Sequence, residues 1–176
     1  MKTSEKNPAV ENEAAQPFEQ KSAIVSLGAE PQIFYPLVAQ QDFLKGMAPR
    51  QLEQLAESAL RMQFEAGQQI FREGDQANRF FIILKGRVLL ESEGEDGSMI
   101  PIQTLGPGDD LGWSWLFEPY YLHFNARTIE PTDVLFFYAT RLRQQCEEDP
   151  ALGYELMKRI AKVVVRRLEA TQRAIR

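Results

Sequence analysis

The sequence FEAGQQIFREGDQA at residues 64–77, followed by FFIILKGRV at residues 80–88 and GPGDDLG at residues 106–112, decides the fold of this chain. In all three stretches glycines lie beside apolar runs, where a tight reversal of the backbone needs the positive φ that glycine adopts readily. Asp75 and Asp109 are suited to hydrogen bonding with backbone amides in such turns. The pattern predicts short strands joined by tight turns, and it assigns these glycines and aspartates to the fold rather than to a ligand.

Short apolar runs extend over the whole middle of the chain, from Arg61 to Tyr138. They recur at intervals of about 8–12 residues with glycine-bearing turns between them, which is typical of an antiparallel sandwich or barrel. Residues 95–98, with the sequence Glu-Asp-Gly-Ser, lie between two such runs and predict a hairpin turn. We expect about eight strands.

Helical patterns flank this region on both sides. Pro49 stands where a helix start favours proline, and apolar residues at spacings of three and four follow as far as Leu60. Thr140 is placed to cap a short helix that runs through Cys146. Pro150 then opens a long helix, which would reach roughly 40 Å at about 1.5 Å per residue. This helix carries one apolar stripe that needs a surface to cover it. The stripe consists of Leu152, Leu156, Ile160, Val163, Val164 and Leu168.

Length and composition indicate one cytoplasmic domain. A chain of 176 residues suffices for one domain of the usual size and not for two. We expect residues 34–176 to form that domain and residues 1–33, which are mostly polar, to form a flexible N-terminal arm. No apolar run approaches the roughly 20 residues that span a bilayer, and no signal peptide is recognisable, so we expect no membrane insertion. The net charge of −5 argues against a protein that coats nucleic acid with its whole surface.

The sequence offers little for catalysis. The single histidine, His123, excludes the multi-histidine sites that hold metals in many small enzymes, so we expect no metal. No nucleophile motif accompanies His123, which is interpreted as a structural residue. The single cysteine, Cys146, excludes an intramolecular disulfide, and its acidic neighbours Glu147 and Glu148 raise the pKa of its thiol. We therefore expect a protein that is not an enzyme.

The three quoted stretches, in this order and between helices, resemble the β-roll of the cyclic nucleotide-binding domain family, which includes the catabolite activator proteins and kinase regulatory subunits. The similarity covers roughly Phe43 to Arg176. It implies an α+β fold, a jelly-roll-like double-stranded β-helix with flanking helices. It also implies a homodimer in which the C-terminal helix, about residues 151–176, pairs with its twin. Transcription factors of the family continue into a helix-turn-helix module. Because the sequence stops at Arg176, we expect no sequence-specific DNA binding by this chain.

Ligand binding in the family depends on a phosphate-binding cassette, the short helix after the third stretch. Its helix N-terminus and an arginine hold the cyclic phosphate, and a glutamate after the first glycine holds the ribose hydroxyl. Here Gly112 and Leu116 match the cassette, but Trp113 replaces the glutamate, and Leu122 or His123 falls where the arginine is expected. Because each charge-assisted bond contributes a few kcal/mol, the loss of both anchors predicts cyclic nucleotide binding weakened by several orders of magnitude.

Other residues remain candidates for contact with a ligand. Arg127 lies five residues beyond the expected arginine and would rescue phosphate binding if it pointed into the roll. On a strand it shares a face with Ile129, while Ala126 and Thr128 take the other face. Thr171 matches a threonine that lies near the purine base in the activator proteins. The candidate ligand contacts are Gly112, Trp113, Ser114, Trp115, Leu116, His123, Asn125, Arg127, Thr128 and Thr171.

The aromatic cluster and the basic C-terminal helix can each be interpreted in two ways. Six aromatic residues, both tryptophans included, crowd positions 113–124. They either plug a vestigial pocket or line a surface for a flat ligand or a partner. The C-terminal helix carries seven cations against Glu155 and Glu169, which is either a solvated face or a site for phosphate or an acidic partner.

The sequence thus predicts a regulatory or sensor domain that acts through a partner and whose ligand is unknown. One alternative is a genuine receptor for cyclic AMP or cyclic GMP that uses Arg127 and backbone amides. A second alternative is a structural or assembly adaptor that docks through the tryptophan-rich cassette.

Overall fold

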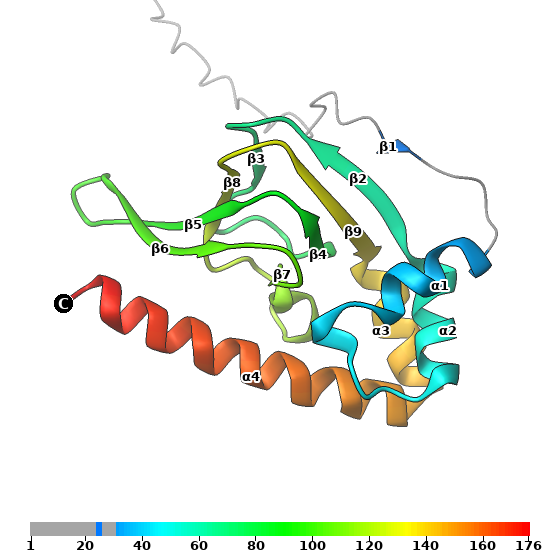
Figure 1. Cartoon of the computed structure of the whole chain (residues 1–176). Helices are drawn as coiled ribbons and strands as arrows, with labels where there is room; N and C mark the ends of the chain where they lie inside the picture. Colours follow the sequence, from blue (N-terminus) through cyan, green and yellow to red (C-terminus); the bar gives the residue numbers. More distant parts are fainter. Residues whose placement is uncertain (1–23, 26–30) are drawn as a thin grey trace, which may run out of the picture.

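The structure is a computed structural model that describes residues 24–25 and 31–176. Two antiparallel sheets form a roll, with helices at one end and a long helix along one side (Figure 1). The strands are β1 (Ile24–Val25), β2 (Leu60–Phe64), β3 (Gln69–Phe71), β4 (Arg79–Lys85), β5 (Val88–Glu93), β6 (Met99–Leu105), β7 (Asp110–Leu111), β8 (Asn125–Thr128) and β9 (Thr132–Tyr138). The helices are α1 (Pro31–Ala39), α2 (Pro49–Ser58), α3 (Ala139–Glu148) and α4 (Pro150–Ala174), with the 3-10 helices η1 (Asp42–Leu44) and η2 (Trp113–Leu116). The predicted α+β class and β-roll are confirmed.

The order of the strands explains how the glycine-bearing turns build a roll. One sheet has the order β1-β2-β9-β4-β7, and the other has the order β3-β8-β5-β6. The predicted hairpin at residues 95–98 joins β5 to β6, with Gly97 at a φ of 77°. In the centre of the first sheet β4 pairs with β9, where Phe81 lies opposite Phe136.

The apolar run of β4 is continuous because both of its faces are buried. Phe81 faces the interior of the roll, and its ring centroid lies 6.3 Å from that of Phe71 on β3. Phe80 faces the helices, and its ring centroid lies 5.3 Å from that of Phe43 in η1. Each fully buried side chain of this kind contributes about 1.5–3 kcal/mol. The core therefore continues through the first sheet, from the roll into the helical layer.

Two glycines occupy positions where a side chain does not fit. Gly112 has a φ of 79°, and a Cβ atom there would lie 2.7 Å from the carbonyl oxygen of Arg79. Gly86 has a φ of 95°, and a Cβ atom there would lie 2.5 Å from the carbonyl oxygen of Pro131. Both positions need glycine's access to positive φ. Gly112 thereby directs the chain from β7 into η2.

Two helix predictions are wrong in detail. Helix α2 ends at Ser58, and Leu60 begins β2, where it lies opposite Phe136. Its apolar side chain therefore belongs to the sheet and not to the helical stripe. Helix α3 begins at Ala139 directly after β9, and no side chain caps it, so Thr140 lies within the helix and is not its cap.

Helix α4 begins at Pro150, as predicted, and Asp149 caps it by accepting hydrogen bonds from the amides of Ala151 and Leu152. The four stripe residues from Leu152 to Val163 are buried, whereas Leu168 is 57% exposed. Because α4 packs along β6, η2 and α3, the chain's own domain covers most of the stripe that was expected to need a second copy. No helix in the described ranges is long and apolar enough to cross a membrane.

Two elements come from the end of the segment that was expected to be an arm. Strand β1 pairs antiparallel with β2, with Ile24 opposite Met62. Helix α1 begins at Pro31. The remainder of the expected arm, residues 1–23 and 26–30, lies outside the described residues.

Candidate functional site

The cassette is a single short turn of helix. Helix η2 is a 3-10 helix of four residues that follows Gly112, and residues 117–124 lead from it to β8. The Gly74 amide donates to the Leu122 carbonyl at 2.8 Å, and the Leu122 amide donates to the Asp75 carbonyl at 2.8 Å. The turn at Gly74 and Asp75 therefore fixes the main chain of Leu122 through both its carbonyl and its amide.

An inner pocket lies in the roll beside the cassette. Its lining includes Asp110, Trp113, Ser114, Leu122, Phe124 and Arg167. Its volume is about 10 Å³, because these side chains fill the space. One water molecule needs roughly 10–15 Å³, whereas pockets for small molecules measure roughly 300–1,000 Å³. The inner pocket therefore has no room for a nucleotide in this conformation.

Asp110 on β7 and Arg167 on α4 place two buried charges at this pocket. Arg167 is 5% exposed and donates to Gln103 Oε1 at 2.8 Å and to the Asp110 carbonyl oxygen at 3.0 Å. Asp110 is 2% exposed, and its Oδ2 atom has no hydrogen-bond partner in the described part of the chain. Burial raises the pKa of Asp110 to about 6 despite the attraction of Arg167. Burial likewise lowers the pKa of Arg167.

Ser114, His123 and Trp113 form a connected group. The hydroxyl of Ser114 lies 2.9 Å from Nδ1 of His123. The His123 ring stacks on Trp113, with ring centroids 5.1 Å apart and planes 15° apart. Trp113, which replaces the expected glutamate, therefore stacks on His123, one of the two residues at which the arginine is expected.

Trp115 belongs to the helical layer and not to the inner pocket. It is fully buried, and its ring centroid lies 6.1 Å from that of Phe80. Arg143 of α3 donates to the Trp115 carbonyl at 2.8 Å and lies over the Tyr120 ring at 4.4 Å from its centroid. These contacts fasten the cassette to α3. Leu116 is half-buried and packs against the core.

The β8 candidates separate onto two faces of the strand. Arg127 is half-buried and donates to Glu91 Oε1 of β5 at 3.0 Å. Its neighbours Ala126 and Thr128 are fully buried. The Thr128 hydroxyl donates to the Glu65 carbonyl and accepts from the Gln68 amide at 2.8 Å. Thr128 therefore stabilises the turn before β3 by hydrogen bonds. Arg127 lies on the face of β8 opposite Thr128.

The remaining two candidates bond to the backbone. Asn125 Oδ1 accepts a hydrogen bond from the Glu73 amide at 3.2 Å. The Thr171 hydroxyl is half-buried and donates to the Arg167 carbonyl, one turn earlier on α4, at 2.9 Å. Of the ten predicted contacts, the structure gathers Gly112, Trp113, Ser114 and His123 at the inner pocket.

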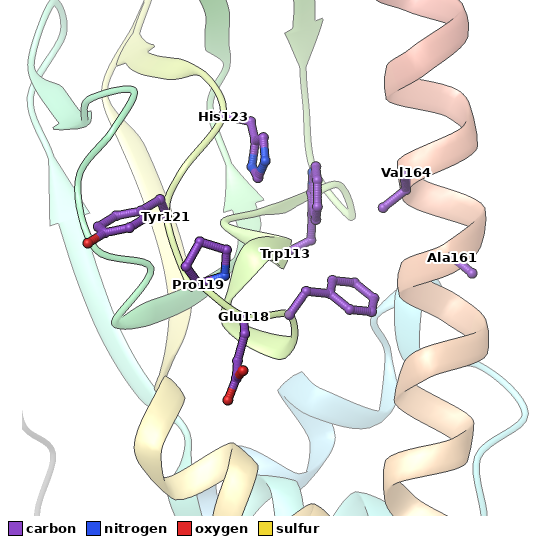
Figure 2. Close-up of a pocket in the computed structure, with 8 residues that line it drawn as sticks. Trp113, Glu118, Pro119, Tyr121, His123, Ala161 and Val164 are labelled. Carbon is purple, nitrogen blue, oxygen red and sulfur yellow. The ribbon is translucent and has the colours of Figure 1, made fainter.

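An aromatic groove of about 410 Å³ lies on the other side of the Trp113–His123 stack. Figure 2 shows Trp113 between His123 and Val164 of α4. Phe117 and Tyr121 also line the groove and are 41% and 46% exposed. The crowded aromatics thus divide between three places: the helical layer, the inner pocket and this groove.

The described residues contain no group of three or more histidine, cysteine or carboxylate side chains that could hold a metal ion. Burial, with smaller contributions from Asp149 and Glu147, raises the pKa of Cys146 to about 11. The predicted direction is confirmed, but burial is the larger cause.

The sequence profile of the cyclic nucleotide-binding domain matches residues 61–149. The chain belongs to the cyclic nucleotide-binding domain family. The CRP-like cAMP-activated global transcriptional regulator of Mycobacterium tuberculosis is 25% identical over 135 residues, which are 77% of this chain and 58% of the regulator. The chain thus spans little more than half the length of this curated relative.

Solved cyclic nucleotide-binding domains share the fold. A protein from Geobacter metallireducens GS-15, described as a cyclic nucleotide-binding protein, is 28% identical with a TM-score of 0.67, over 79% of this chain and 98% of that chain. A cyclic nucleotide-binding domain from Methylobacillus flagellatus KT has a TM-score of 0.73 over 90% of both chains at 18% identity. The resemblance inferred from the three quoted stretches is therefore confirmed.

Sequence reasoning missed the two charged residues of the inner pocket. Asp110 stands in the third quoted stretch, next to an aspartate that the turn requires, and Arg167 stands within a run of cations. The signal for Asp110 was its place at the start of a short strand, where alternation directs one residue into the roll. Arg167 lies at the spacing of the buried stripe, four residues after Val163.

Proposed function

We propose that this chain is a regulatory domain of the cyclic nucleotide-binding fold that does not recognise cyclic nucleotides and acts through a protein partner. The observation that carries this proposal is the filled inner pocket, whose free volume is only about 10 Å³. To admit a nucleotide, Leu122 would have to leave the pocket. Its two backbone hydrogen bonds fix the main chain of Leu122, so the side chain could leave only by a change of rotamer.

The charge of the inner pocket also disfavours a phosphate. The carboxylate of Asp110 is buried there, and Arg167 is already engaged by Gln103 and a backbone carbonyl. A cyclic phosphate would meet a like charge in a region of low dielectric, where repulsion is stronger than in water. The family's arginine is expected at Leu122 or His123, and neither carries a guanidinium; the Nδ1 atom of His123 lies within hydrogen-bond distance of the Ser114 hydroxyl.

The alternative of a cyclic nucleotide receptor built on Arg127 is less well supported. Arg127 is paired with Glu91 and lies on the face of β8 opposite the buried Ala126 and Thr128. A guanidinium on that face has no path to a phosphate inside the roll. Rescue by Arg127 would require β8 to reverse its two faces, which is a one-residue change of register.

The Ser114–His123 pair has the spacing of a catalytic pair, but its surroundings support a role that is not enzymatic. Its separation of 2.9 Å is suitable for a nucleophile and its base. However, Ser114 is only 3% exposed, so its hydroxyl is closed to substrates. No described carboxylate bonds to Nε2 of His123, so the third member that orients such a base is missing from the described residues.

The exposed side of α4 supports a homodimer. Apolar side chains alternate at spacings of three and four along this side, which is the heptad pattern of a coiled-coil seam. The seam consists of Tyr154, Met157, Ala161, Val164, Leu168, Thr171 and Ile175. Tyr154, Leu168 and Ile175 are 62%, 57% and 70% exposed. The seam shares Val164 and Leu168 with the predicted stripe but contains none of its four buried residues, so one helix can pack on its own domain and on a second copy.

Calorimetric titration with cyclic AMP and with cyclic GMP tests the proposed loss of binding. The cAMP-activated regulator of Mycobacterium tuberculosis serves as the positive control. We expect no saturable heat at nucleotide concentrations that saturate the control. Saturable binding in the micromolar range would overturn the proposal.

A second candidate function, an assembly adaptor that docks through the cassette, is favoured by the exposure of Phe117 and Tyr121 in the aromatic groove. Trp115 has no part in it, because it is fully buried. Substitution Phe117→Ser removes an exposed groove side chain, and Tyr138→Ser removes a similarly exposed ring on β9 as the control. An adaptor of this kind loses its partner in pull-downs with the first variant and keeps it with the second.

A further inference from the structure

A second groove lies on the opposite flank of α4, between this helix and the turn that follows η1. Its volume is about 910 Å³, and we call it the basic groove. Its lining includes the cations Lys45, Lys158, Arg159, Lys162 and Arg166. Only two carboxylates, Asp42 and Glu155, line it with them, so the groove has a net charge of +3.

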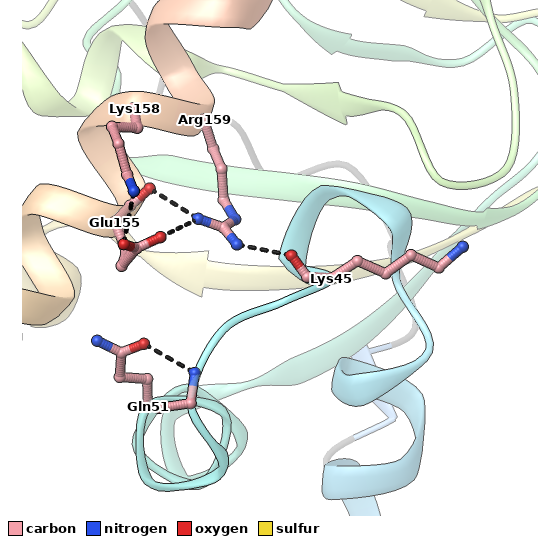
Figure 3. Close-up of polar contacts among 6 residues, drawn as sticks. Lys45, Gln51, Glu155, Lys158 and Arg159 are labelled. Carbon is pink, nitrogen blue, oxygen red and sulfur yellow. Dashed lines mark hydrogen bonds and ion pairs between the residues drawn. The ribbon is translucent and has the colours of Figure 1, made fainter.

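Both carboxylates of the groove are already neutralised. Asp42 is paired with Lys45. Glu155 is paired with Lys158 at 2.7 Å and with Arg159 at 2.5 Å, as Figure 3 shows. The hydrogen bonds from Lys158 and Arg159 lower the pKa of Glu155, so its charge persists at neutral pH. One excess positive charge remains on Lys158 and Arg159, which share Glu155. The other two are carried by Lys162 and Arg166, for which no ion pair is found among the described residues.

The groove has a fixed wall. Arg159 is only 15% exposed and donates to the carbonyl oxygen of Lys45 at 2.6 Å (Figure 3). This bond joins α4 to the turn after η1 across more than one hundred residues of sequence. Arg159 also bonds to Glu155 on its own helix, so one guanidinium links both sides of the groove. The groove is thus formed before any partner arrives, which lowers the entropic cost of binding.

Charged and apolar residues run in parallel rows along α4. Lys158, Lys162 and Arg166 follow one another at intervals of four, so they form one ridge of the helix. Ala161 and Val165, also four apart, form the next ridge, and Val165 is 54% exposed. Phe43 lines the floor of the groove. A complementary partner therefore needs a row of carboxylates beside a row of small apolar side chains.

We propose that the basic groove binds an amphipathic acidic segment of a protein partner, with carboxylates on the Lys158–Arg166 ridge and apolar side chains on Val165. This rests on the proposed function, because it names the surface through which the domain meets its partner. A second copy of α4 is the wrong occupant, since it carries the same cations. A nucleic acid is disfavoured because the whole chain has a charge of −5 and the ridge spans only about 12 Å.

The test is a binding titration by fluorescence anisotropy with a designed peptide. The probe is a fluorescein-labelled helical peptide with glutamates in one row and leucines in the next, and its control carries glutamines in place of the glutamates. We expect saturable binding of the glutamate peptide and at least about tenfold weaker binding of the glutamine peptide, because the groove attracts charge. Equal binding of the two peptides, or binding of neither, would overturn the proposal.

Variants of the full chain localise the binding. The double variant Lys162→Glu with Arg166→Glu reverses the ridge, and Arg173→Glu with Arg176→Glu makes the same change of net charge outside the groove on exposed residues. We expect the first pair to weaken binding of the glutamate peptide by about tenfold or more and the second by less than about twofold. Equal losses would show attraction by net charge alone and would refute the groove as the site.

Substitution of the apolar ridge distinguishes binding of a protein segment from binding of a simple polyanion. Val165→Ser removes the exposed apolar contact without a change of charge, and Ile129→Ser is its control, at an exposed apolar residue outside both the groove and the seam. We expect Val165→Ser to weaken binding about threefold and Ile129→Ser to leave it unchanged. A single-stranded DNA that binds more tightly than the peptide, with no effect of Val165→Ser, would contradict the proposal. These results are independent of the nucleotide titration, so either proposal can fail alone.

Discussion

Arg167 donates a hydrogen bond to the main-chain carbonyl of Asp110, at 3.0 Å, and forms no ion pair within 4 Å with its carboxylate. The long helix and the roll are therefore joined through a backbone group. The carboxylate remains buried with one oxygen atom that no described residue satisfies. An unsatisfied polar atom of this kind is costly to the folded state.

We predict that the charge of Asp110 destabilises the fold at neutral pH. Its pKa is raised from 3.8 to about 6, mainly by burial. Because the folded chain binds this proton more tightly than the unfolded chain, the stabilisation is complete below about pH 4 and is lost as the pH rises through about 6. Asp110→Asn should therefore become more stable than the wild type as pH rises, by about 3 kcal/mol at pH 7.5. Urea unfolding at pH 4 and at pH 7.5 measures this difference, and a difference that is the same at both pH values would contradict the prediction.

We predict that Arg167 is required for stability and that its neighbour Arg166 is not. Arg167→Ala removes the bonds to Gln103 and Asp110 and leaves a buried carboxylate without its counter-charge. The free energy of unfolding should fall by about 3 kcal/mol, whereas the exposed Arg166→Ala should change it by less than about 0.5 kcal/mol. Equal effects of the two substitutions in urea unfolding would be inconsistent with a buried link between α4 and the roll.

We predict that two glycine substitutions differ in their effect although both residues have positive φ. Gly67 has a φ of 76° with no atom within 4 Å of an added Cβ, whereas Gly112 has a φ of 79° and an added Cβ would lie 2.7 Å from a carbonyl oxygen. Gly67→Ala should cost about 1 kcal/mol from its backbone conformation alone. Gly112→Ala should cost about 3 kcal/mol, because the chain must also move away from β4. Thermal unfolding followed by circular dichroism compares them, and Gly67→Ala as the more damaging change would refute this description of the cassette entry.

We predict that the exposed seam of α4 makes the protein a dimer. Leu168→Glu places a charge in the middle of the seam and should convert the dimer into a monomer, because two carboxylates would be buried together. Ile129→Glu changes an exposed apolar residue outside α4 and is the matched control. Sedimentation velocity reports the outcome directly. A wild-type protein that sediments as a monomer at all concentrations tested would exclude the seam as an interface.

The fold was predictable from sequence because its glycines and apolar runs have local causes. The run Phe80–Leu84 is apolar at every position because β4 has the roll on one face and helices on the other. The turn at residues 95–98 is encoded by four consecutive residues. Such signals do not depend on contacts between distant segments.

The site was predictable only in part, because its geometry depends on such distant contacts. The sequence alone predicts the loss of the family's charged anchors, with Trp113 in place of the glutamate and Leu122 or His123 in place of the arginine. The filling of the inner pocket cannot be predicted from the sequence, because the main chain of Leu122 is bonded to the turn at Gly74 and Asp75, almost fifty residues away. Likewise, the burial of Arg167 depends on Gln103 and Asp110, so composition alone places it with the solvated cations.

The most direct test of the central claim is a crystal structure of the protein grown with a large excess of cyclic AMP. We predict a roll whose interior is filled by Leu122 and Phe124, with the His123 ring stacked on Trp113 and no nucleotide between the sheets. Electron density for a cyclic phosphate inside the roll, bonded to the guanidinium of Arg127 or to the amides of η2, would contradict the account.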